Sequence, residues 1–216
     1  MHNNTLSTTD LAQISDPALR KLASLGRLQR FAPHTLFINE GDLSDAAYVM
    51  LHGRVKVFAS EPDGSEIVLN ICGAGECIGE MALDGGTRSA SVITLEAVTC
   101  SVISRAALRE SITQEPDFAL QLIALLIGRA RLATDKIKGL ALHGVYERIT
   151  HLLLGLAQER DGVWVVSEPL SQQEIAHRVG ASRDMVSRVL KELLNGGHIR
   201  IERKIITLLK KLPAHW

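Results

Sequence analysis

Small and charged residues come together in the segment Gly79–Ala90 in a pattern that suits a sugar phosphate. The exposed backbone N–H groups of such a segment form a nest for an anion. Arg88 can pair with a phosphate, and Glu80 can accept a hydrogen bond from a sugar hydroxyl. The segment therefore predicts a ligand that carries phosphate and ribose. The alternative is a polar loop in which Glu80 and Arg88 pair with each other.

A second group of side chains, far along the chain, has the chemistry of base recognition. Arg183, Asp184, Ser187 and Arg188 occupy positions i, i+1, i+4 and i+5, which lie on one face of a helix. An arginine can donate two hydrogen bonds to guanine O6 and N7, and a carboxylate can accept one from cytosine N4. This face therefore predicts contact with the edges of DNA bases. The alternative is a solvated helix face with an ion pair between Asp184 and Arg188.

Two short helices are needed to present that face, and the sequence marks both of them. Ser171 is an N-cap residue, and Glu174, three residues later, completes a capping box. Gly180 permits a tight turn, Ser182 caps the second helix, and Asn195–Gly197 ends it. Two short helices joined by a turn that contains glycine predict a helix-turn-helix, whose second helix enters the major groove of DNA.

A hairpin is expected directly after the second helix. The segments Ile199–Ile201 and Ile205–Leu208 alternate apolar and polar residues, and Glu202–Lys204 forms the tip between them. The cations of this tip suit contact with DNA phosphates, so the pattern predicts a winged helix-turn-helix. The residues expected on DNA are Ser171, Gln172, Ser182, Arg183, Asp184, Ser187, Arg188, Lys191, Arg203 and Lys204.

The first half of the chain has the pattern of an all-β body. Between Thr35 and Ser104, short β-branched runs alternate with turn residues, which is typical of a sandwich or barrel. The expected strands are Leu36–Ile38, Ala47–Leu51, Arg54–Phe58, Glu66–Ile71, Ala90–Thr94 and Thr99–Ile103. A helical lead-in is expected over residues 11–29, because leucine and isoleucine recur there at helical spacing.

Helices are expected after the β body. Arg105–Thr113 forms a short one, another begins near Pro116, and a long helical stretch runs from Phe118 to about Gly144. Its apolar residues step by four and three, and so narrow a seam favours pairing with a second copy of the chain over burial as an ordinary core helix. The interface residues expected in this parallel homodimer are Leu126, Ala130, Ala133, Ile137 and Leu140.

The end of the long helix is expected to bend. Gly139 and Gly144 have low helix propensity, which lowers the energy of a bend around Leu142–Gly144. A further amphipathic helix is expected over Val145–Glu159, and Arg160–Gly162 closes it.

The charge of the chain is divided unevenly. From Ser171 to Trp216 there are nine cations and four anions, which gives +5 for this part and −5 for the rest, because the formal net charge is zero. A basic region suits a nucleic acid. Cys72, Cys77 and Cys100 lack the spacing of a zinc site or a disulfide framework, so we expect buried reduced thiols in strands.

Several classes of protein lack support in the sequence. There is no P-loop lysine motif, no nucleophile elbow and no cluster of metal ligands, so we expect no enzyme and no bound metal. No apolar run is long enough to span a membrane, and Met1–Asp10 has no secretory pattern, so a cytoplasmic protein is expected.

The segment Gly79–Ala90 resembles the phosphate-binding cassette of cyclic nucleotide-binding domains. Together with the expected helix-turn-helix, it makes the chain similar, from about Leu11 onward, to the cAMP receptor protein/FNR superfamily of bacterial transcription regulators. The resemblance implies an α+β fold with three parts. These are a cyclic nucleotide-binding β-roll (a double-stranded β-helix or jelly roll) at 1–116, a dimerisation helix with a hinge at 117–144, and a winged helix-turn-helix at 145–216.

The resemblance also implies roles for the ligand residues. Glu80 corresponds to the residue that binds the ribose 2′-hydroxyl, Arg88 and Ser89 to those that bind the cyclic phosphate, and Thr134 to a hydroxyl that contacts the base. Ala133 stands at another hydroxyl position and lacks the oxygen. We therefore expect cAMP as the effector, with cGMP and cyclic di-GMP as alternatives. The ligand residues so implied are Gly79, Glu80, Met81, Ala82, Arg88, Ser89, Ala90 and Thr134.

The resemblance further implies how DNA is recognised. Asp184-x-x-Ser187-Arg188 is similar to the Glu-x-x-Ser-Arg arrangement of the FNR branch, and Arg183 resembles an arginine of the cAMP receptor branch. We expect a homodimer on double-stranded DNA, bound to inverted half-sites with a TGA core one helical turn apart. RNA polymerase is a further expected partner, and no membrane contact is expected.

Other effectors and functions fit less of the sequence. The N-terminal cysteine cluster of an iron–sulfur sensor is absent, and the scattered histidines give no support for haem. A ligand-independent regulator is an alternative, although the set Glu80, Arg88 and Ser89 argues against it. A cyclic nucleotide-binding regulatory module of a larger signalling complex is another, and the helix-turn-helix argues against that one.

Overall fold

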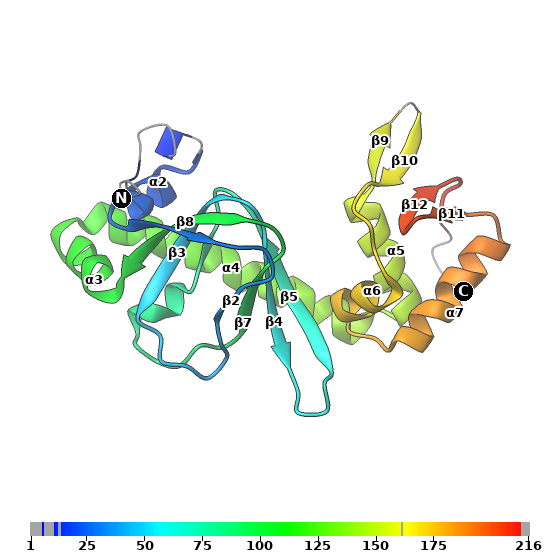
Figure 1. Cartoon of the computed structure of the whole chain (residues 1–216), viewed down its shortest axis with the longest axis horizontal. Coiled ribbons are helices and arrows are strands. Elements are labelled where there is room, and N and C mark those ends of the chain that lie inside the picture. The colour runs from blue at the N-terminus through cyan, green and yellow to red at the C-terminus, as the bar shows by residue number, and fades with distance from the viewer. Residues whose placement is uncertain (1–5, 7–10, 13, 161, 213–216) are drawn as a thin grey trace. The chain divides into compact units, whose positions relative to one another are not determined.

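The computed structural model describes residues 6, 11–12, 14–160 and 162–212 (Figure 1). The chain forms two compact units, the first from Met1–Gly64 and Leu69–Arg129 and the second from Ser65–Val68 and Ala130–Trp216. In chain order the elements are α2 (Pro17–Ser24), β1 (Arg27–Phe31), β2 (Leu36–Ile38), β3 (Ala46–His52), β4 (Val55–Ser60), β5 (Glu66–Cys72), β6 (Cys77–Ile78), the 3-10 helix η1 (Glu80–Leu83), β7 (Ser91–Thr94), β8 (Val98–Ser104), α3 (Arg105–Gln114), α4 (Pro116–Leu142), α5 (Val145–Leu156), β9 (Gln158–Arg160), β10 (Val163–Val166), α6 (Gln172–Val179), α7 (Arg183–Asn195), β11 (Ile199–Glu202) and β12 (Ile205–Leu208).

The β body of the first unit consists of two four-stranded sheets, with strand orders β1-β8-β3-β6 and β2-β7-β4-β5. Alternate residues of these strands point inward, as strand geometry requires, and form a shared apolar core. This core includes Ile38, Met50, Val55, Val92 and Cys100. The α+β class and the six expected strands are confirmed, each strand within one or two residues of its expected ends.

The expected helical lead-in over residues 11–29 is wrong at its C-terminal end. Helix α2 stops at Ser24, and the chain then enters β1, which pairs antiparallel with β8. A Cβ atom added at Gly26 would lie 2.7 Å from the carbonyl oxygen of Val102, so the backbone approaches β8 more closely than a side chain allows. The leucine spacing could not reveal this, because strand pairing over a long sequence separation overrides the local periodicity.

The three cysteines lie in strands and are buried and reduced, as predicted. Burial raises the pKa of the Cys72 thiol to about 11 and the pKa values of the Cys77 and Cys100 thiols to about 12. The thiolate, and not the thiol, is the reactive form of cysteine. Near neutral pH these side chains are therefore protonated and act as apolar core residues.

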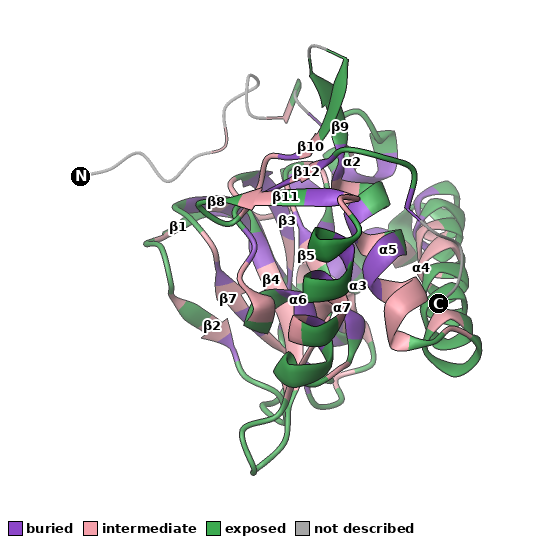
Figure 2. Ribbon diagram, turned by 90° about the vertical axis from the view of Figure 1, so that its right-hand side faces the viewer, coloured by how far each residue is buried: buried purple, intermediate pink, exposed green. Residues whose placement is uncertain are grey.

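Helix α4 begins at Pro116 as expected and ends at Leu142, and the break before α5 falls at His143 and Gly144, as predicted. Most of α4 is exposed in the single chain (Figure 2). Its exposed large apolar side chains begin before the expected seam and are unevenly spaced. They include Leu120, Ile123, Ile127, Ile137 and Leu140, with exposed fractions of 64%, 50%, 48%, 65% and 44%.

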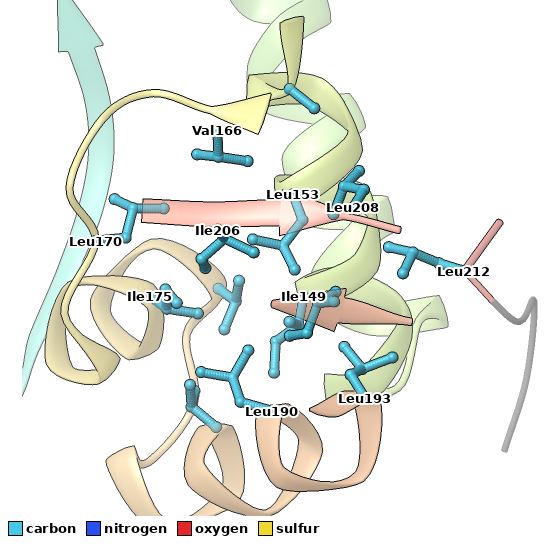
Figure 3. Close-up of a cluster of buried hydrophobic side chains, with 14 of the residues drawn as sticks. Ile149, Leu153, Val166, Leu170, Ile175, Leu190, Leu193, Ile206, Leu208 and Leu212 are labelled. Carbon is cyan, nitrogen blue, oxygen red and sulfur yellow. The ribbon is translucent and has the colours of Figure 1, made fainter. Parts of the chain in front are cut away.

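The second unit surrounds its own apolar core with α5, α6, α7 and a four-stranded sheet of order β11-β12-β10-β9. Figure 3 shows side chains of this core, among them Ile149, Leu153, Ile175, Leu190 and Ile206. The expected helix Val145–Glu159 is too long, because α5 ends at Leu156 and the next residues form β9. Pairing of β9 with β10 explains the difference, and Asp161 of the expected closing turn lies outside the described residues.

The described part of the chain has neither a membrane-spanning helix nor a cluster of metal ligands. No helix there has both the length and the apolar content that a membrane crossing requires. No group of three or more histidine, cysteine, aspartate or glutamate side chains is arranged there to hold a metal ion.

Candidate functional sites for a nucleotide and for DNA

The segment Gly79–Ala90 folds back on itself, so its two ends lie together. Gly79 adopts a left-handed conformation with φ of 72° and ψ of 21°, which starts η1 directly after β6. The carbonyl oxygen of Gly79 accepts a hydrogen bond of 3.0 Å from Ala82 N–H within this turn. On the returning part of the segment, before β7, Arg88 N–H donates to Asp42 O at 2.8 Å. The structure therefore gathers all the expected ligand residues of this segment in one loop.

Arg88 is buried within that loop, with an exposed fraction of 7%. Its guanidinium donates to the carbonyl oxygens of Ala46 and Gly79, at 2.8 and 3.2 Å, and lies over the ring of Tyr48. A Cβ atom added at Gly79 would be only 2.5 Å from Arg88 Nη1. Glycine is thus needed at this position for two reasons, its positive φ and the space that the guanidinium occupies.

Glu80 forms its ion pair with Arg129 of α4, so the alternative of a Glu80–Arg88 pair is wrong. Arg129 Nη1 lies 2.5 Å from Glu80 Oε2, and Arg129 Nη2 also donates to the carbonyl oxygen of Cys77. Burial disfavours the charged form of Arg129, but the Glu80 carboxylate outweighs it and raises the pKa of Arg129 above its ordinary value. A permanent cation, Arg129, therefore lies beside Glu80, the residue that is expected to bind the ribose.

Sequence reasoning missed Arg129 as a residue of this site. Its only local signal is its position on the long helix, five residues before Thr134. Its partner Glu80 is far away in sequence, and nothing in the helical pattern of α4 indicates which side chain faces the loop.

The remaining expected ligand residues occupy different surroundings. Ser89 is exposed, and its hydroxyl donates to the sulfur of Met81 at 3.2 Å. Ala82 and Ala90 are buried and hold the loop against the β body. Thr134 belongs to the second unit, where its hydroxyl donates to Ala130 O at 2.9 Å and the residue is exposed, and its contact with a ligand stays a prediction.

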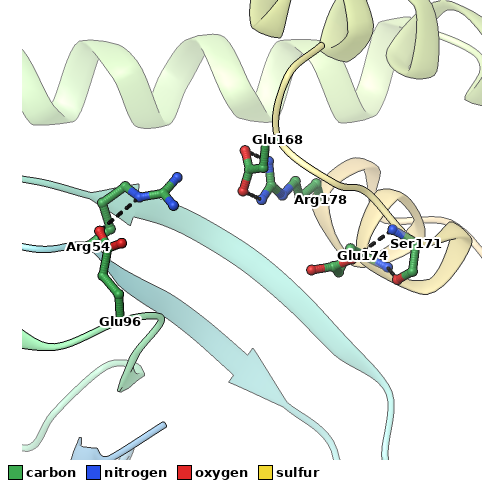
Figure 4. A network of polar contacts seen from close by, with 6 residues as sticks. All are labelled: Arg54, Glu96, Glu168, Ser171, Glu174 and Arg178. Atoms are coloured by element: carbon green, nitrogen blue, oxygen red, sulfur yellow. Dashed lines mark hydrogen bonds and ion pairs between the residues drawn. The ribbon is translucent and has the colours of Figure 1, made fainter. Parts of the chain in front are cut away.

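The helix-turn-helix has the caps that the sequence predicts. Ser171 and Glu174 form a capping box, with Glu174 N–H donating to Ser171 Oγ at 3.1 Å and Ser171 N–H to Glu174 Oε2 at 2.7 Å (Figure 4). Arg178 of α6 makes two hydrogen bonds, of 2.7 and 3.2 Å, to the carboxylate of Glu168 (Figure 4). The helix ends at Gly180, whose left-handed conformation starts the turn toward α7.

Helix α7 has one face in the core and the other in solvent. Ser182 caps it by accepting from Met185 N–H at 3.2 Å, and its inner side chains include Val186 and Leu190. Its exposed side chains include Met185 and several charged residues. Among them are Arg183, Asp184, Arg188 and Lys191, all exposed, with Ser187 half-buried beside them. In the part of the chain that the structure describes, no ion pair joins Asp184 to Arg188, so the alternative of an internal pair is not formed.

The hairpin after α7 is confirmed, with β11 and β12 paired antiparallel from Ile199 opposite Leu208 to Glu202 opposite Ile205. Its two-residue turn consists of Arg203 and Lys204, which have φ values of 49° and 68°. Both side chains are exposed. The left-handed conformation is unfavourable for residues other than glycine, asparagine and aspartate, so this turn retains two cations at some energetic cost.

Two family profiles match the sequence, one over each site. The family described as "Cyclic nucleotide-binding domain" matches residues 28–115, which include Gly79–Ala90. The family described as "Crp-like helix-turn-helix domain" matches residues 147–212, which include α6, α7 and the hairpin.

Similar proteins are found both among curated sequences and among solved structures. The chain is 35% identical over 180 residues to a CRP-like cAMP-activated global transcriptional regulator of Mycobacterium tuberculosis, covering 81% of this chain and 80% of the relative. It is 30% identical over 199 residues to the cAMP-activated global transcriptional regulator CRP of Escherichia coli, covering 90% and 95%. The structure of the c-di-GMP responsive global regulator CLP of Xanthomonas campestris matches with a TM-score of 0.76 and 28% identity, covering 90% of this chain and 99% of that one.

Proposed function

The chain belongs to the cAMP receptor protein/FNR superfamily of bacterial transcription regulators, and we propose that it is a homodimeric DNA-binding regulator controlled by a cyclic nucleotide. The observation that carries this proposal is the ion pair between Glu80 and Arg129. This ion pair joins the nucleotide loop to α4. The same helix continues to Leu142, and the segment that contains the DNA-binding helices follows it along the chain.

The nucleotide site uses three kinds of group. The backbone N–H groups at the start of η1 and the Ser89 hydroxyl bind the cyclic phosphate, and the remaining N–H donors of the buried Arg88 guanidinium neutralise its charge. The Glu80 carboxylate accepts from the ribose 2′-hydroxyl through the oxygen that Arg129 leaves free. This arrangement recognises a cyclic ribose phosphate with any base.

The base is the less determined part of the ligand. Two relatives are described as cAMP-activated and one as c-di-GMP responsive. We propose cAMP, with cGMP and cyclic di-GMP as the alternatives, because Thr134 offers one hydroxyl to a base while Ala133 offers none.

The homodimer forms through α4. The exposed residues Leu120, Ile123, Ile127, Ala130, Ile137 and Leu140 follow one another at intervals of 3, 4, 3, 7 and 3, which is the spacing of a coiled-coil seam. Ala130, Ile137 and Leu140 of the expected interface lie on this exposed helix. The pairing places two copies of α7 on one DNA duplex, so we propose inverted half-sites with a TGA core.

DNA contact uses the exposed face of α7 and the tip of the hairpin. Arg183, Asp184 and Arg188 read base edges, because their side chains are exposed and near the N-terminus of the recognition helix. Arg203 and Lys204 contact phosphates. We also propose that the bound dimer contacts RNA polymerase in the cytoplasm.

Nucleotide control is an equilibrium between two arrangements of the dimer. The nucleotide shifts this equilibrium only to the extent that it binds the DNA-competent arrangement more tightly. A ligand-independent regulator would bind DNA equally well in all conditions, and a module of a larger complex would not bind DNA alone.

Calorimetry of the purified protein separates these functions. The titrants are cAMP, cGMP and cyclic di-GMP, each with and without a DNA duplex that carries two TGA half-sites. We expect one nucleotide to bind more tightly when DNA is present, and sedimentation to give twice the mass of the 23.5 kDa chain. Equal DNA affinity with and without every nucleotide would contradict nucleotide control, and absence of DNA binding would contradict the regulator itself.

A further inference from the structure

The side chain of Arg148, the fourth residue of α5, binds the ends of two other helices. Its Nη1 donates to His143 O at 2.9 Å and, over a longer distance of 3.4 Å, to Leu140 O, at the C-terminal end of α4. Its Nε donates to Val179 O at 2.8 Å and its Nη2 to Gly180 O at 3.1 Å, at the C-terminal end of α6. A single guanidinium thus holds four backbone carbonyl groups from two helix ends.

The electrostatics of α5 itself do not favour an arginine here. The N-terminal end of a helix carries a partial positive charge, so a cation close to it is unfavourable. The C-terminal ends of α4 and α6 carry partial negative charges and unpaired carbonyl groups, and these are the groups that Arg148 binds. Arg148 is therefore explained by its contacts with α4 and α6, and not by the stability of α5.

A separate apolar contact joins the same two helix ends. A Cβ atom added at Gly180 would lie 3.1 Å from Leu140 Cδ2, so the side chain of Leu140 packs on the glycine that starts the turn between α6 and α7. Leu140 was expected in the dimer seam, and the structure shows that it also contacts the DNA-binding part of its own chain. The end of α4 is thus linked to this turn in two ways. Arg148 binds carbonyl groups of both, and Leu140 packs directly on Gly180.

His143 and Gly144, which lie between α4 and α5, also contact side chains of α5. Gly144 N–H donates to Glu147 Oε2 at 3.0 Å, and the rings of His143 and His151 meet edge to face with centroids 5.0 Å apart. The break in the helix at His143 and Gly144 is therefore bridged by side chains on α5, and the Arg148 side chain reaches both helix ends.

We propose that Arg148 is the positioning residue that couples the end of α4 to the turn of the helix-turn-helix. It fixes the distance between the carbonyl groups at the end of α4 and those at Val179 and Gly180. A displacement of the end of α4 then moves the turn, and with it the N-terminal residues of α7 that face DNA. This inference rests on the proposed function, because it assigns the route from nucleotide to DNA.

The test replaces Arg148 and measures coupling separately from binding. DNA affinity is measured with and without saturating nucleotide, using whichever of cAMP, cGMP and cyclic di-GMP binds the unchanged protein. Arg148→Gln should reduce the gain in DNA affinity caused by the nucleotide by about tenfold, within the usual range of allosteric coupling. Nucleotide affinity without DNA should stay within about threefold, because the ligand loop is untouched.

Two further variants complete the design. Arg160→Gln removes an exposed cation of the second unit on β9 and should leave the coupling unchanged. Arg148→Lys keeps the charge but lacks the forked geometry that reaches two helix ends, so it should show a partial loss of coupling. This variant also tests the proposal if Arg148→Gln fails to fold.

Amide hydrogen exchange gives a readout that needs no ligand. In Arg148→Gln and Arg148→Lys, amides at the end of α4 and at Val179–Ala181 should exchange about tenfold faster, while those of the β body are unchanged. Unchanged coupling and unchanged exchange at both helix ends would overturn the proposal. If the unchanged protein binds neither nucleotide nor DNA, the proposed function fails, and the exchange rates still decide whether Arg148 holds the two ends together.

Discussion

The arginines of the two candidate sites differ in their surroundings. Arg88 and Arg129 in the first unit are at least partly buried and bind carbonyl groups or a carboxylate of the protein itself. Arg183 and Arg188 on α7 extend into solvent. The nucleotide site is thus part of the structure that holds the first unit together, whereas the DNA surface is carried on a fold that does not depend on it. Substitutions in the two sites should therefore have different consequences.

The largest effect is expected for Arg88→Ala. It removes one hydrogen-bond donor from each of the Ala46 and Gly79 carbonyl groups and leaves the loop without its buried cation, so the free energy of unfolding should fall by about 2 kcal/mol. Nucleotide affinity should fall by at least about a hundredfold, since charge-assisted hydrogen bonds to the phosphate are lost. Chemical denaturation and calorimetry measure the two effects, and nucleotide-independent DNA affinity should persist.

The exposed Arg30 of β1 supplies the matched control for Arg88. Arg30→Gln should change neither stability nor nucleotide affinity, because exposed substitutions of this kind have small effects. If Arg88→Ala lowered nucleotide affinity without any loss of stability, the contrast between the two sites would be wrong.

Arg188→Ala should affect only DNA. Loss of a two-bond contact to a guanine weakens binding by about 1–3 kcal/mol, and the loss should be greatest on duplexes with the TGA core. The melting temperature should stay the same, because the side chain is exposed. Fluorescence anisotropy on matched and mutated half-sites measures the change. DNA binding unaffected by this substitution would remove Arg188 from the interface.

High pH should destabilise the first unit selectively, because all three cysteines lie there. Their folded pKa values, about 11 for Cys72 and about 12 for Cys77 and Cys100, exceed the ordinary value of 9.0, so folding disfavours the thiolate. The stability from each thiol is complete below pH 9 and is lost as the pH rises toward the folded pKa, by up to about 1.4 kcal/mol per pH unit.

This dependence can be measured by denaturation at pH 8 and pH 10. Circular dichroism follows the whole chain, and tryptophan fluorescence follows the second unit through Trp164. Cys100→Ala should make the stability less dependent on pH. An equal loss of stability in both units over this range would argue against buried thiols as the cause.

The smallest effects are expected at the hairpin tip of the second unit. Replacing Arg203 by asparagine and Lys204 by glycine supplies the residues that a left-handed two-residue turn prefers, so the free energy of unfolding should rise by about 1 kcal/mol. The dependence of log DNA affinity on log salt concentration should become shallower by about 2, because two phosphate contacts are lost. An unchanged salt dependence would show that the tip does not contact phosphates.

Sequence patterns that span only a few residues predicted the structure of the second unit better than that of the first. Ser171 and Glu174 are three residues apart, and both ends of their capping box are visible in the sequence. The helical spacing before Leu28 was misleading, because β1 exists only through its pairing with β8. Arg129 was missed for the same reason, since its partner Glu80 comes from the β body. Contacts between distant segments follow from tertiary packing, which local spacing does not encode.

The continuity of α4 has one more consequence. From Ala130 to Leu140 the chain is helical without interruption, so the residue count fixes the rotation about the axis of α4 between Thr134, the expected base contact, and Leu140, which packs on Gly180. One inserted residue would rotate everything beyond it by about 100° and advance it by about 1.5 Å. An insertion or deletion in this stretch is therefore tolerable only if its number of residues corresponds to whole turns of the helix. The length of the stretch is thus more strictly constrained than the identity of most of its exposed residues.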